Sequence, residues 1–411
     1  MNNHYQAVIV GGGPAGATAA LMLARAGWSV AVVEKVGFPR RKVCGEFLSA
    51  TAFPLLRELG VADAFLALAG PEVRRIALFA QESLLEPDMP CVKGQSVALG
   101  RALGREQLDT LLVQHAAHAG ATVWQPWTVT AIDKEDRQSV CRLVAKDHQE
   151  TRTLRAPVVI LAHGSWDHGT LPTQALRHAK RPSDLLAFKA HFLGARLEPG
   201  LMPLVIFPGG YGGLVQTDGA RVSLSCCIRR DSLERCRRMW PQASAADAVF
   251  EHIRASCRGI RETLAHATLD GSWLSVGPIH PVLRSRTMDG LFLIGNAAGE
   301  AHPIIAEGIA MAMQSARLLC DLLIGRQEAV WAGQAHQSIA RDYALRWRTA
   351  FSSRLYAGTL FSTLALTTQG AAAAVAALTR FPAMLTAGAR WSGKVTPGIT
   401  RNRPSSMIMV P

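Results

Sequence analysis

The first 34 residues restrict the folds open to this chain more than any other segment. An apolar run at residues 5–10 leads directly into a glycine-rich turn at residues 11–16, a helical stretch at residues 17–26, and a second apolar run that ends on Glu34. This order of strand, glycine turn, helix, strand and acid is typical of the βαβ unit that binds a dinucleotide. We therefore predict a parallel α/β domain at the amino end. The alternative is a glycine turn in an unrelated parallel sheet.

The residues of the glycine turn have separate physical roles in such a unit. Gly11 permits the tight turn, Gly13 lets a pyrophosphate approach the backbone, and Gly16 lets the helix pack close to the strand. The N-terminus of the helix offers free N–H groups and partial positive charge to phosphates. Glu34 can accept hydrogen bonds from both ribose hydroxyls, and its charge repels a 2′-phosphate, so NADP fits this site poorly. The predicted nucleotide contacts in this segment are Gly11, Gly13, Pro14, Ala15, Gly16, Glu34 and Lys35.

Size and composition indicate a large globular protein. The chain has 411 residues, of which 49% are hydrophobic and 18% are charged, which suits two or three structural units and argues against disorder. Its eight cysteines include no C-x-x-C pair, and no signal peptide precedes the first strand, so we expect reduced thiols and a cytoplasmic location. The thirteen histidines include no H-E-x-x-H motif, and we predict no metal site.

Positive charge is concentrated at the C-terminal end. The net charge is +13, and from Arg341 onward nine Lys or Arg stand against one acid. Residues 355–379 carry no charge, and two helices that meet at Gly370 fit this stretch better than one membrane span does. The apolar face of these helices either contacts an anionic membrane peripherally or caps the protein's own substrate cavity. No basic-aromatic platform favours nucleic-acid binding, so we expect no nucleic-acid partner.

The middle of the chain follows a different pattern from its start. Residues 157–162 and 290–295 are buried strands of the opening α/β type, whereas residues 185–229 alternate strand-like segments with glycine and proline turns, as in an antiparallel sheet. A second glycine run, residues 208–213, precedes no helical pattern and is better interpreted as a bend between strands. The chain then has one nucleotide site. The expected division is a nucleotide-binding domain at 1–80, 97–175 and 275–340, a substrate domain at 81–96 and 176–274, and a helical, basic C-terminal part at 341–411.

Further motifs follow the opening turn in a fixed order. They are Lys42-Val43-Cys44-Gly45, Arg105 within residues 104–109, a strand that ends on Ala162-His163-Gly164, and the segment 295–309. Together they resemble the FAD-dependent oxidoreductases of the p-hydroxybenzoate hydroxylase superfamily, and within it the geranylgeranyl reductase group. That group has a K-x-C-G loop near the flavin and a G-D-A-A-G…P…G-E-G-I pattern, which residues 295–309 match with one change. The resemblance covers roughly residues 5–325. It implies a Rossmann-like FAD-binding domain with an inserted antiparallel-sheet substrate domain and a helical C-terminal part.

The resemblance also implies roles for single residues. Arg105 would lie along the phosphates and ribityl chain, although the residue alone could equally be a helix-capping surface charge. Cys44 and Gly45 would approach the isoalloxazine ring. Gly308 and Ile309 would begin a helix whose N-terminus points at the pyrimidine edge, where negative charge develops on reduction. The further predicted flavin contacts are Cys44, Gly45, Arg105, Gly295, Asn296, Gly308 and Ile309.

Two residues depart from the family pattern. Asn296 stands where an aspartate normally contacts the ribityl hydroxyls, but an amide can still bond a hydroxyl, so we expect FAD binding to survive. His163 replaces the acid of a D-G motif that the hydroxylases use for both FAD and NAD(P)H, which leaves NADH or NADPH in doubt as external reductant. The W-x-W-x-I-P string of the related halogenases is missing, and on that ground we set halogenation aside.

Three residues are candidates for catalysis. Tyr211 lies in a glycine bend, at a place similar to the Y-x-W-x-F-P segment of the reductases. His302 could act as acid or base at neutral pH, and Cys44 could act near the flavin or be only a small hydrophobe. Phe188, Phe192 and Phe207 would line an apolar pocket for a small hydrophobic substrate, or be plain core.

The chemistry that these features favour is flavin chemistry on an apolar substrate. The leading hypothesis is an FAD-dependent monooxygenase that hydroxylates an aromatic or lipid-like small molecule in biosynthesis. The alternatives are a reductase of isoprenoid or other alkenes, and a flavin-binding maturation or accessory protein.

Overall fold

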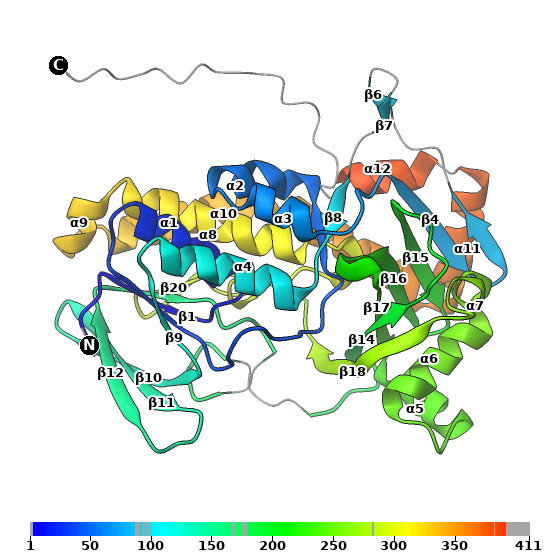
Figure 1. The fold of residues 1–411 in the computed structure, drawn as a ribbon, viewed down its shortest axis with the longest axis horizontal. Helices are drawn as coiled ribbons and strands as arrows, with labels where there is room; N and C mark the ends of the chain where they lie inside the picture. The colour runs from blue at the N-terminus through cyan, green and yellow to red at the C-terminus, as the bar shows by residue number, and fades with distance from the viewer. Residues whose placement is uncertain are drawn as a thin grey trace.

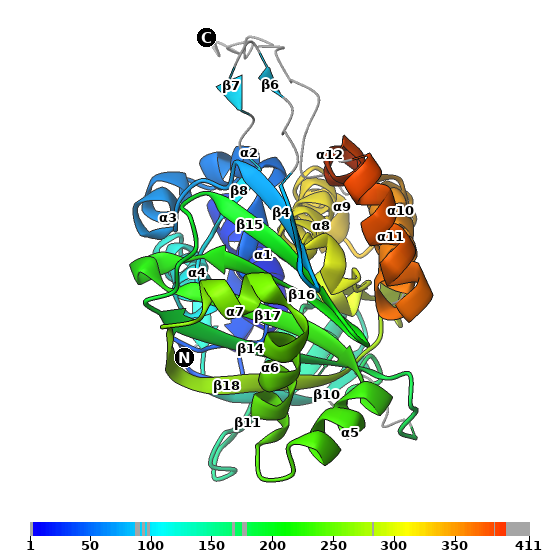
Figure 2. The same cartoon turned by 90° about the vertical axis from the view of Figure 1, so that its right-hand side faces the viewer.

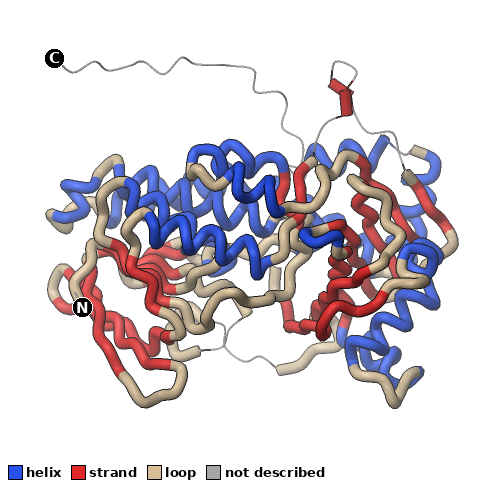
Figure 3. The backbone as a smooth tube through the Cα atoms, viewed as in Figure 1, coloured by secondary structure: helices blue, strands red, loops and turns tan. Residues whose placement is uncertain are grey.

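Two lobes lie side by side along the long axis of the molecule (Figure 1). The computed structural model describes residues 3–86, 91–92, 95–96, 99–166, 169–174, 179–281, 283–381 and 383–391. One lobe holds a parallel sheet under a layer of helices, and the other holds a larger sheet with short helices on one face (Figures 1 and 3). The fold is the predicted α/β type with a second, mostly antiparallel sheet and a helical C-terminal part.

The parallel sheet of the first lobe contains the predicted opening strand at its centre. Its strand order is β19-β20-β13-β1-β2-β9, and only β19 runs antiparallel to its neighbour. Each residue of β1, β2, β13 and β20 is buried, because helices cover one face and a second sheet covers the other. The strands are β1 (Ala7–Val10), β2 (Val30–Val33), β9 (Thr122–Trp124), β13 (Val158–Leu161), β19 (Thr287–Met288) and β20 (Leu291–Leu293).

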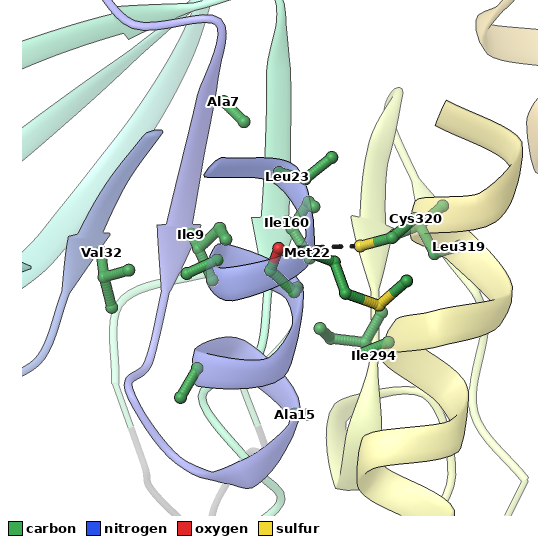
Figure 4. Close-up of a cluster of buried hydrophobic side chains, with 14 of the residues drawn as sticks. Ala7, Ile9, Ala15, Met22, Leu23, Val32, Ile160, Ile294, Leu319 and Cys320 are labelled. Carbon is green, nitrogen blue, oxygen red and sulfur yellow. Dashed lines mark hydrogen bonds between the residues drawn. The ribbon is translucent and has the colours of Figure 1, made fainter. Parts of the chain in front are cut away.

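Three helices cover one face of this sheet: α1 (Pro14–Arg25), α4 (Arg105–His118) and α8 (Gly308–Ile324). Figure 4 shows Ile9 and Ile160 of the sheet beneath Met22 of α1, with Leu319 and Cys320 of α8 alongside. The Sγ atom of Cys320 lies 3.8 Å from a carbonyl oxygen of α1. A three-stranded antiparallel sheet lies on the opposite side and consists of β10 (Trp127–Glu135), β11 (Gln138–Ala145) and β12 (Thr151–Ala156). The sequence indicated only part of this sheet.

The second lobe is built on a seven-stranded sheet in the order β18-β14-β17-β16-β15-β4-β5. Its pairings are antiparallel, as predicted for residues 185–229, except that β15 pairs parallel with β4. Helices α5 (Arg230–Met239), α6 (Ala245–Ser256) and α7 (Arg258–Thr263) cover its outer face (Figure 2). The strands are β4 (Arg75–Ala80), β5 (Ser83–Leu85), β14 (Leu185–Leu193), β15 (Leu201–Phe207), β16 (Gly210–Gln216), β17 (Val222–Arg229) and β18 (Thr268–Ile279).

The second glycine run belongs to this sheet. Residues 208–209 form the turn of the β15–β16 hairpin, and the remaining glycines lie in β16 itself. A Cβ on Gly212 would lie 2.6 Å from a carbonyl oxygen of β17, so these glycines allow close strand packing. The expected domain division stays a prediction, although the pairing of β4 extends the second sheet into residues that we assigned to the nucleotide-binding domain.

Short elements complete the two lobes. β3 pairs with β8 near the junction between them, and β6 pairs with β7. The remaining elements are β3 (Phe47–Ser49), η1 (Ala50–Ala52), α2 (Phe53–Glu58), α3 (Ala62–Leu68), β6 (Cys91–Val92), β7 (Gln95–Ser96), β8 (Gly100–Ala102), η2 (Asp218–Ala220), η3 (Gly295–Ala297), η4 (Pro303–Ile305) and α9 (Gln327–Trp331).

The C-terminal part consists of α10 (His336–Leu366), α11 (Thr368–Arg380) and α12 (Ala383–Trp391), which lie along one side of the molecule (Figure 2). The junction between α10 and α11 is at Thr367, not at Gly370 as predicted, because the Thr367 hydroxyl accepts a hydrogen bond from Gly370 N–H and caps α11. No single helix in the described ranges is long and apolar enough to cross a membrane. Residues 336–366 and 369–380, bent by 106°, meet that test only as a pair. Residues 392–411 of the expected C-terminal part lie outside the described residues.

Candidate functional site: a cavity between the glycine turn and the large sheet

A cavity of about 280 Å³ lies where the two lobes meet. Its wall combines the glycine turn, the loop at residues 42–47, the start of α4, the segment 295–309 and the inner face of β14–β17. The structure thus brings together motifs that are up to 300 residues apart in the sequence. Every residue predicted to contact the cofactor lines this cavity except Gly16, which lies behind the turn, and so do all three catalytic candidates.

The glycine turn leaves room where a diphosphate would pass. Gly11 has φ +108°, and a Cβ there would lie 2.5 Å from the carbonyl oxygen of Ala162. A Cβ on Gly16 would lie 1.8 Å from the carbonyl oxygen of Gly11, so no other residue lets α1 approach β1 this closely. Above Gly13 the space is open, and the nearest atoms to an added Cβ are guanidinium nitrogens of Arg105 and Arg40, each 3.8 Å away.

The start of α1 adds to this anion-binding character. No side chain caps its N-terminal N–H groups, which point towards the space above the turn. Two guanidinium groups and uncapped amides are the donors that a diphosphate requires, and the residues present therefore fit the ADP half of FAD. Arg40 was not among the predicted contacts. Its place in the charged loop after Glu34 was the available signal.

Glu34 is held rigidly at the end of β2. Its carboxylate accepts hydrogen bonds from Gly12 N–H at 2.8 Å and from Val36 N–H at 3.2 Å, and Arg40 Nη2 lies 3.2 Å from Oε2. Two carboxylate oxygens have about four acceptor sites, so these contacts leave capacity for ribose hydroxyls. Lys35, the next residue, is exposed at the rim of the cavity.

Arg105 is a buried charge on the cavity wall rather than a surface cap. Its Nε and Nη2 atoms each lie 2.7 Å from a carboxylate oxygen of Asp109, one turn further along α4. Burial alone would lower the pKa of Arg105, but the Asp109 carboxylate more than offsets this and raises it. The bidentate pair fixes the guanidinium beside the glycine turn.

The segment 295–309 supplies the opposite wall. Asn296 faces the cavity, and its backbone carbonyl oxygen accepts a hydrogen bond from Arg284 Nη1 at 2.7 Å. Helix α8 begins at Gly308 without a side-chain cap, and nothing lies within 4 Å of a Cβ added there, so its N-terminus opens on the cavity. Ala306 is a second change from the family pattern, which has glycine at this position, and its φ of +51° is left-handed. The predicted match with only one change is therefore wrong.

A buried charged cluster that the sequence analysis missed joins the two lobes. Glu46 directly follows the K-x-C-G loop with a left-handed backbone (φ +61°), and its carboxylate forms an ion pair with Lys189 of β14. His191 Nε2 lies 2.7 Å from the same carboxylate, and Arg105 N–H donates to it at 3.1 Å. All three charged or polar side chains of the cluster (Glu46, Lys189 and His191) are fully buried.

The contacts of this cluster set its protonation. The hydrogen bond from His191 and the charge of Lys189 outweigh the effect of burial and lower the pKa of Glu46 to about 2. Glu46 is therefore ionised at neutral pH. Lys189 and His191 lie two residues apart, on the face of β14 that points at the first lobe, and two polar residues at this spacing in an apolar strand were the available signal.

Two of the three catalytic candidates meet on the cavity wall, between strand β16 and the segment 295–309. Tyr211 Oη lies 2.8 Å from His302 Nδ1, and both side chains are buried. Burial lowers the pKa of His302 to about 4 and raises the pKa of Tyr211 well above its usual value, so both groups are neutral at pH 7. Tyr211 lies in strand β16, not in a glycine bend as expected.

The third candidate and His163 lie nearer the glycine turn. Cys44 is half-buried, and its Sγ accepts a hydrogen bond from Glu46 N–H at 3.3 Å. His163 Nδ1 lies 2.8 Å from the carbonyl oxygen of Gly164, and its Nε2 lies 2.9 Å from Thr173 Oγ1. The ring of His163 is thus held by its own loop at the cavity wall.

A carboxyl that the sequence analysis did not select, Glu300, also lines the cavity. Glu300 is 3% exposed, and its Oε1 accepts a hydrogen bond from Trp166 Nε1 at 2.6 Å. Its Oε2 lies 3.5 Å from Arg284 Nη2 and accepts no hydrogen bond from the described part of the chain. Burial raises the pKa of Glu300 above its usual value, against the opposing effect of Trp166 and Arg284.

The aromatic lining differs from the prediction. Phe188, Phe192 and Phe207 all belong to the cluster beneath α5–α7, and of the three only Phe188 also borders the cavity. The other aromatic residues on the cavity wall are Phe47, Trp127, Trp166 and Tyr211, and the aliphatic ones include Ala187, Met202, Leu204, Leu214, Val215, Ile279 and Ile304. Among the residues that the structure describes, no group of three or more His, Cys, Asp or Glu side chains is arranged to hold a metal ion.

Comparison with known proteins matches this chain to an FAD-binding family and to halogenases and reductases. A family model described as "FAD binding domain" matches residues 4–356. The chain is 24% identical over 365 residues to a tryptophan 2-halogenase of Chondromyces crocatus, across 84% of this chain and 67% of that protein. It is 28% identical over 365 residues to digeranylgeranylglycerophospholipid reductase 2 of Methanothermobacter thermautotrophicus, across 85% of each. The solved structure of the myxobacterial chondrochloren halogenase superposes with a TM-score of 0.72 at 20% identity, over 89% of this chain and 83% of that one.

These relatives confirm the resemblance to geranylgeranyl reductases and correct one exclusion. Halogenases and reductases both occur among them, so the missing W-x-W-x-I-P string is no ground for separating this chain from halogenases. The match to the family model spans the glycine turn, the K-x-C-G loop, Arg105 and the segment 295–309. The chain belongs to the FAD-binding-domain family of flavin-dependent oxidoreductases, and FAD is its cofactor.

Proposed function

We propose that this protein is an FAD-dependent monooxygenase that hydroxylates an apolar, phenolic small molecule. When bound and reduced, FAD supplies two electrons that either activate molecular oxygen or pass as a hydride to the substrate. The glycine turn, Glu34 and Arg105 would hold the ADP half, and residues 44–45 and 295–309 would hold the flavin half. The aliphatic and aromatic side chains on the cavity wall suit a hydrophobic substrate and exclude water from it.

The observation that carries this proposal is the Glu300 carboxyl on the cavity wall. The carboxyl is buried and its pKa is raised, and Oε2, 3.5 Å from Arg284 Nη2, accepts no hydrogen bond from the residues that the structure describes, so it can accept the proton of a phenol. A phenol that shares its proton with a base has a more electron-rich ring, which favours attack by an electrophilic oxygen. The neutral pair Tyr211–His302 lies on the same wall and can orient the substrate by hydrogen bonding.

A reductase of alkenes is the second candidate, favoured by Tyr211. Hydride transfer to a carbon–carbon double bond must be completed by a proton, and a phenol with a raised pKa keeps its proton available for donation. The digeranylgeranylglycerophospholipid reductase among the relatives has a name that describes such a reaction. The Glu300 carboxyl has no evident role in that chemistry.

The experiment compares the holoprotein with and without oxygen. FAD is reduced chemically under nitrogen, an alkylphenol or an isoprenoid alcohol is added, and air is admitted to half of each sample in buffers with and without chloride. We expect a product of one added oxygen atom, only from the phenol and only in air. A product of two added hydrogens under nitrogen would overturn the proposal in favour of the reductase, and a chlorinated product would overturn it in favour of a halogenase.

Two further arms test the role of the carboxyl and the electron donor. Glu300→Gln should retain FAD but lower the hydroxylation rate about a hundredfold. Glu82→Gln, an exchange at the exposed surface, is the matched control and should leave the rate unchanged. Titration with NADH and NADPH identifies the reductant. FAD that no donor reduces would contradict the monooxygenase and favour the accessory-protein alternative.

A further inference from the structure

The outer face of α10 carries a row of apolar side chains that the described part of the chain leaves uncovered. Tyr356, Leu360 and Leu364 are spaced by four residues, which places them on one face of the helix, and Tyr356 is 68% exposed. Helix α12 packs beside this row, because the Trp391 and Phe361 rings lie 5.6 Å apart edge to face. Its Met384 and Trp391 are about half exposed. We call Tyr356, Leu360, Leu364, Met384 and Trp391 the apolar flank.

The inner face of the same helix forms part of the site. A Cβ on Gly358 would lie 3.1 Å from His302 Cβ and 3.4 Å from Ile305 Cγ2, so the backbone of α10 lies directly against the segment 295–309. Ala365, the last residue but one of the helix, is buried in the same cluster as Tyr211 and Ile279. The two interpretations of the C-terminal helices, a cap and a membrane contact, therefore correspond to two faces of one helix.

Charge is arranged around the apolar flank rather than within it. Residues 355–379 carry no charge. The exposed Arg380 follows this stretch, whereas Arg354, which precedes it, is turned inward and donates a hydrogen bond to Gln314 Oε1 of α8 at 3.0 Å. The Arg380 guanidinium lies 5.2 Å from the centre of the Phe381 ring, which is itself exposed. Apolar side chains on a helix surface with arginines at their margin are the pattern by which helices lie in the interface of an anionic bilayer.

The same charges argue against a second copy of the chain as the occupant. In the described part of the C-terminal helices, the exposed Arg341, Arg346, Arg348 and Arg380 stand against one acid, Asp342, so two copies that met through the apolar flank would bring like charges together. We propose that the apolar flank rests in the interface of a membrane with anionic lipids, with α10 between the bilayer and the cavity. This inference concerns where the protein works and does not depend on which reaction it catalyses.

The test is flotation of the full-length holoprotein with lipid vesicles. We expect it to float with vesicles of phosphatidylcholine and phosphatidylglycerol, and to stay behind with pure phosphatidylcholine. High salt should weaken the binding because it screens the lipid charge. The double variant Leu360→Asp with Leu364→Asp should lower the vesicle-bound fraction about tenfold or more, since two apolar side chains lose their burial and two charges must enter the interface.

Matched controls keep the result interpretable. Met239→Asp changes an apolar residue on α5 that is more exposed than Leu360 and Leu364, and it should float like the parent protein. FAD absorbance shows that each variant is folded. Equal flotation of the double variant and the parent, or no flotation of the parent on anionic vesicles, would overturn the proposal. A dimer in sedimentation that the double variant abolishes would overturn it in favour of a second copy, and loss of flotation only on removal of residues 392–411 would place the contact in that segment.

Discussion

Tyr211 and His302 meet across the junction of the two lobes, with the phenol oxygen 2.8 Å from Nδ1 of the imidazole. Tyr211 comes from a strand of the large sheet, and His302 comes from the loop before α8, so the contact forms only when both lobes are assembled. Both rings are buried on the cavity wall. This part of the cavity wall is thus shared between the two lobes.

Burial of His302 makes the protein sensitive to acid. Its pKa is lowered to about 4 in the folded state, whereas an unfolded histidine titrates near 6.5, so the unfolded chain binds more protons in this range. The free energy of unfolding should therefore fall by up to roughly 3 kcal/mol as the pH drops from about 6.5 to 4. Urea unfolding of the holoprotein across this range measures the slope. His302→Asn should flatten it, and an unchanged slope in the variant would assign the acid sensitivity to other groups.

A substitution that fills the space above Gly13 tests the position of the cofactor. Gly13→Asp adds a carboxylate beside the guanidinium groups of Arg105 and Arg40, where it pairs with them and occupies the diphosphate position. We expect a folded protein without bound FAD, read from the loss of absorbance near 450 nm, a region typical of oxidised flavin. Gly37→Asp, on an exposed turn where nothing lies within 4 Å of the new Cβ, is the control and should keep the cofactor. Stoichiometric FAD in the Gly13 variant would refute the assigned position.

The buried pair Glu46–Lys189 should behave as a unit. Lys189→Met leaves the Glu46 carboxylate without its cation and should cost about 3 to 5 kcal/mol of unfolding free energy. Adding Glu46→Gln removes the unpaired charge, so the double variant should be more stable than Lys189→Met alone. Chemical denaturation of the four proteins gives the coupling energy. Arg258→Ala, at the exposed pair with Glu262, should change stability by less than about 1 kcal/mol. Strict additivity at Glu46 and Lys189 would contradict the pairing.

The left-handed backbone at Ala306 can be relieved. Glycine adopts φ +51° without the steric cost that a Cβ imposes, so Ala306→Gly should leave stability unchanged or raise it by up to about 1 kcal/mol. Ala310→Gly, in regular helix α8, should instead destabilise by about 1 kcal/mol. Thermal unfolding of both variants gives the comparison. A loss of stability at Ala306 similar to that at Ala310 would show that the observed backbone is not the one the protein uses.

The parts of this structure that could be predicted are those whose signals are local. The glycine turn, its flanking strands and the start of α8 each depend on a few neighbouring residues, and all of them lie where the sequence indicated. The sequence analysis placed the junction of the two helices at Gly370 and missed the cap that Thr367 provides to α11 three residues earlier.

The parts that could not be predicted depend on contacts between distant residues. Glu46 and Lys189 are 143 residues apart, and no sequence pattern near either residue indicates its partner. Similarly, Glu300 becomes a candidate only once Trp166 and Arg284 are seen beside it in an apolar wall. The sequence pattern also could not show which aromatic residues border the cavity, because Phe188 and Phe192 lie on the same strand with the same periodicity.

The strand order of the first lobe has a consequence for how the protein is made. β1 lies between β2 and β13, β20 extends the sheet, and α8 covers α1, so the earliest part of the chain completes its core only after about residue 324 has left the ribosome. The seven-stranded sheet, in contrast, has all its strands by Ile279. During translation the seven-stranded sheet can therefore fold first. The N-terminal segment keeps its apolar surface exposed until α8 has been made, and we expect a chaperone to bind it in that interval.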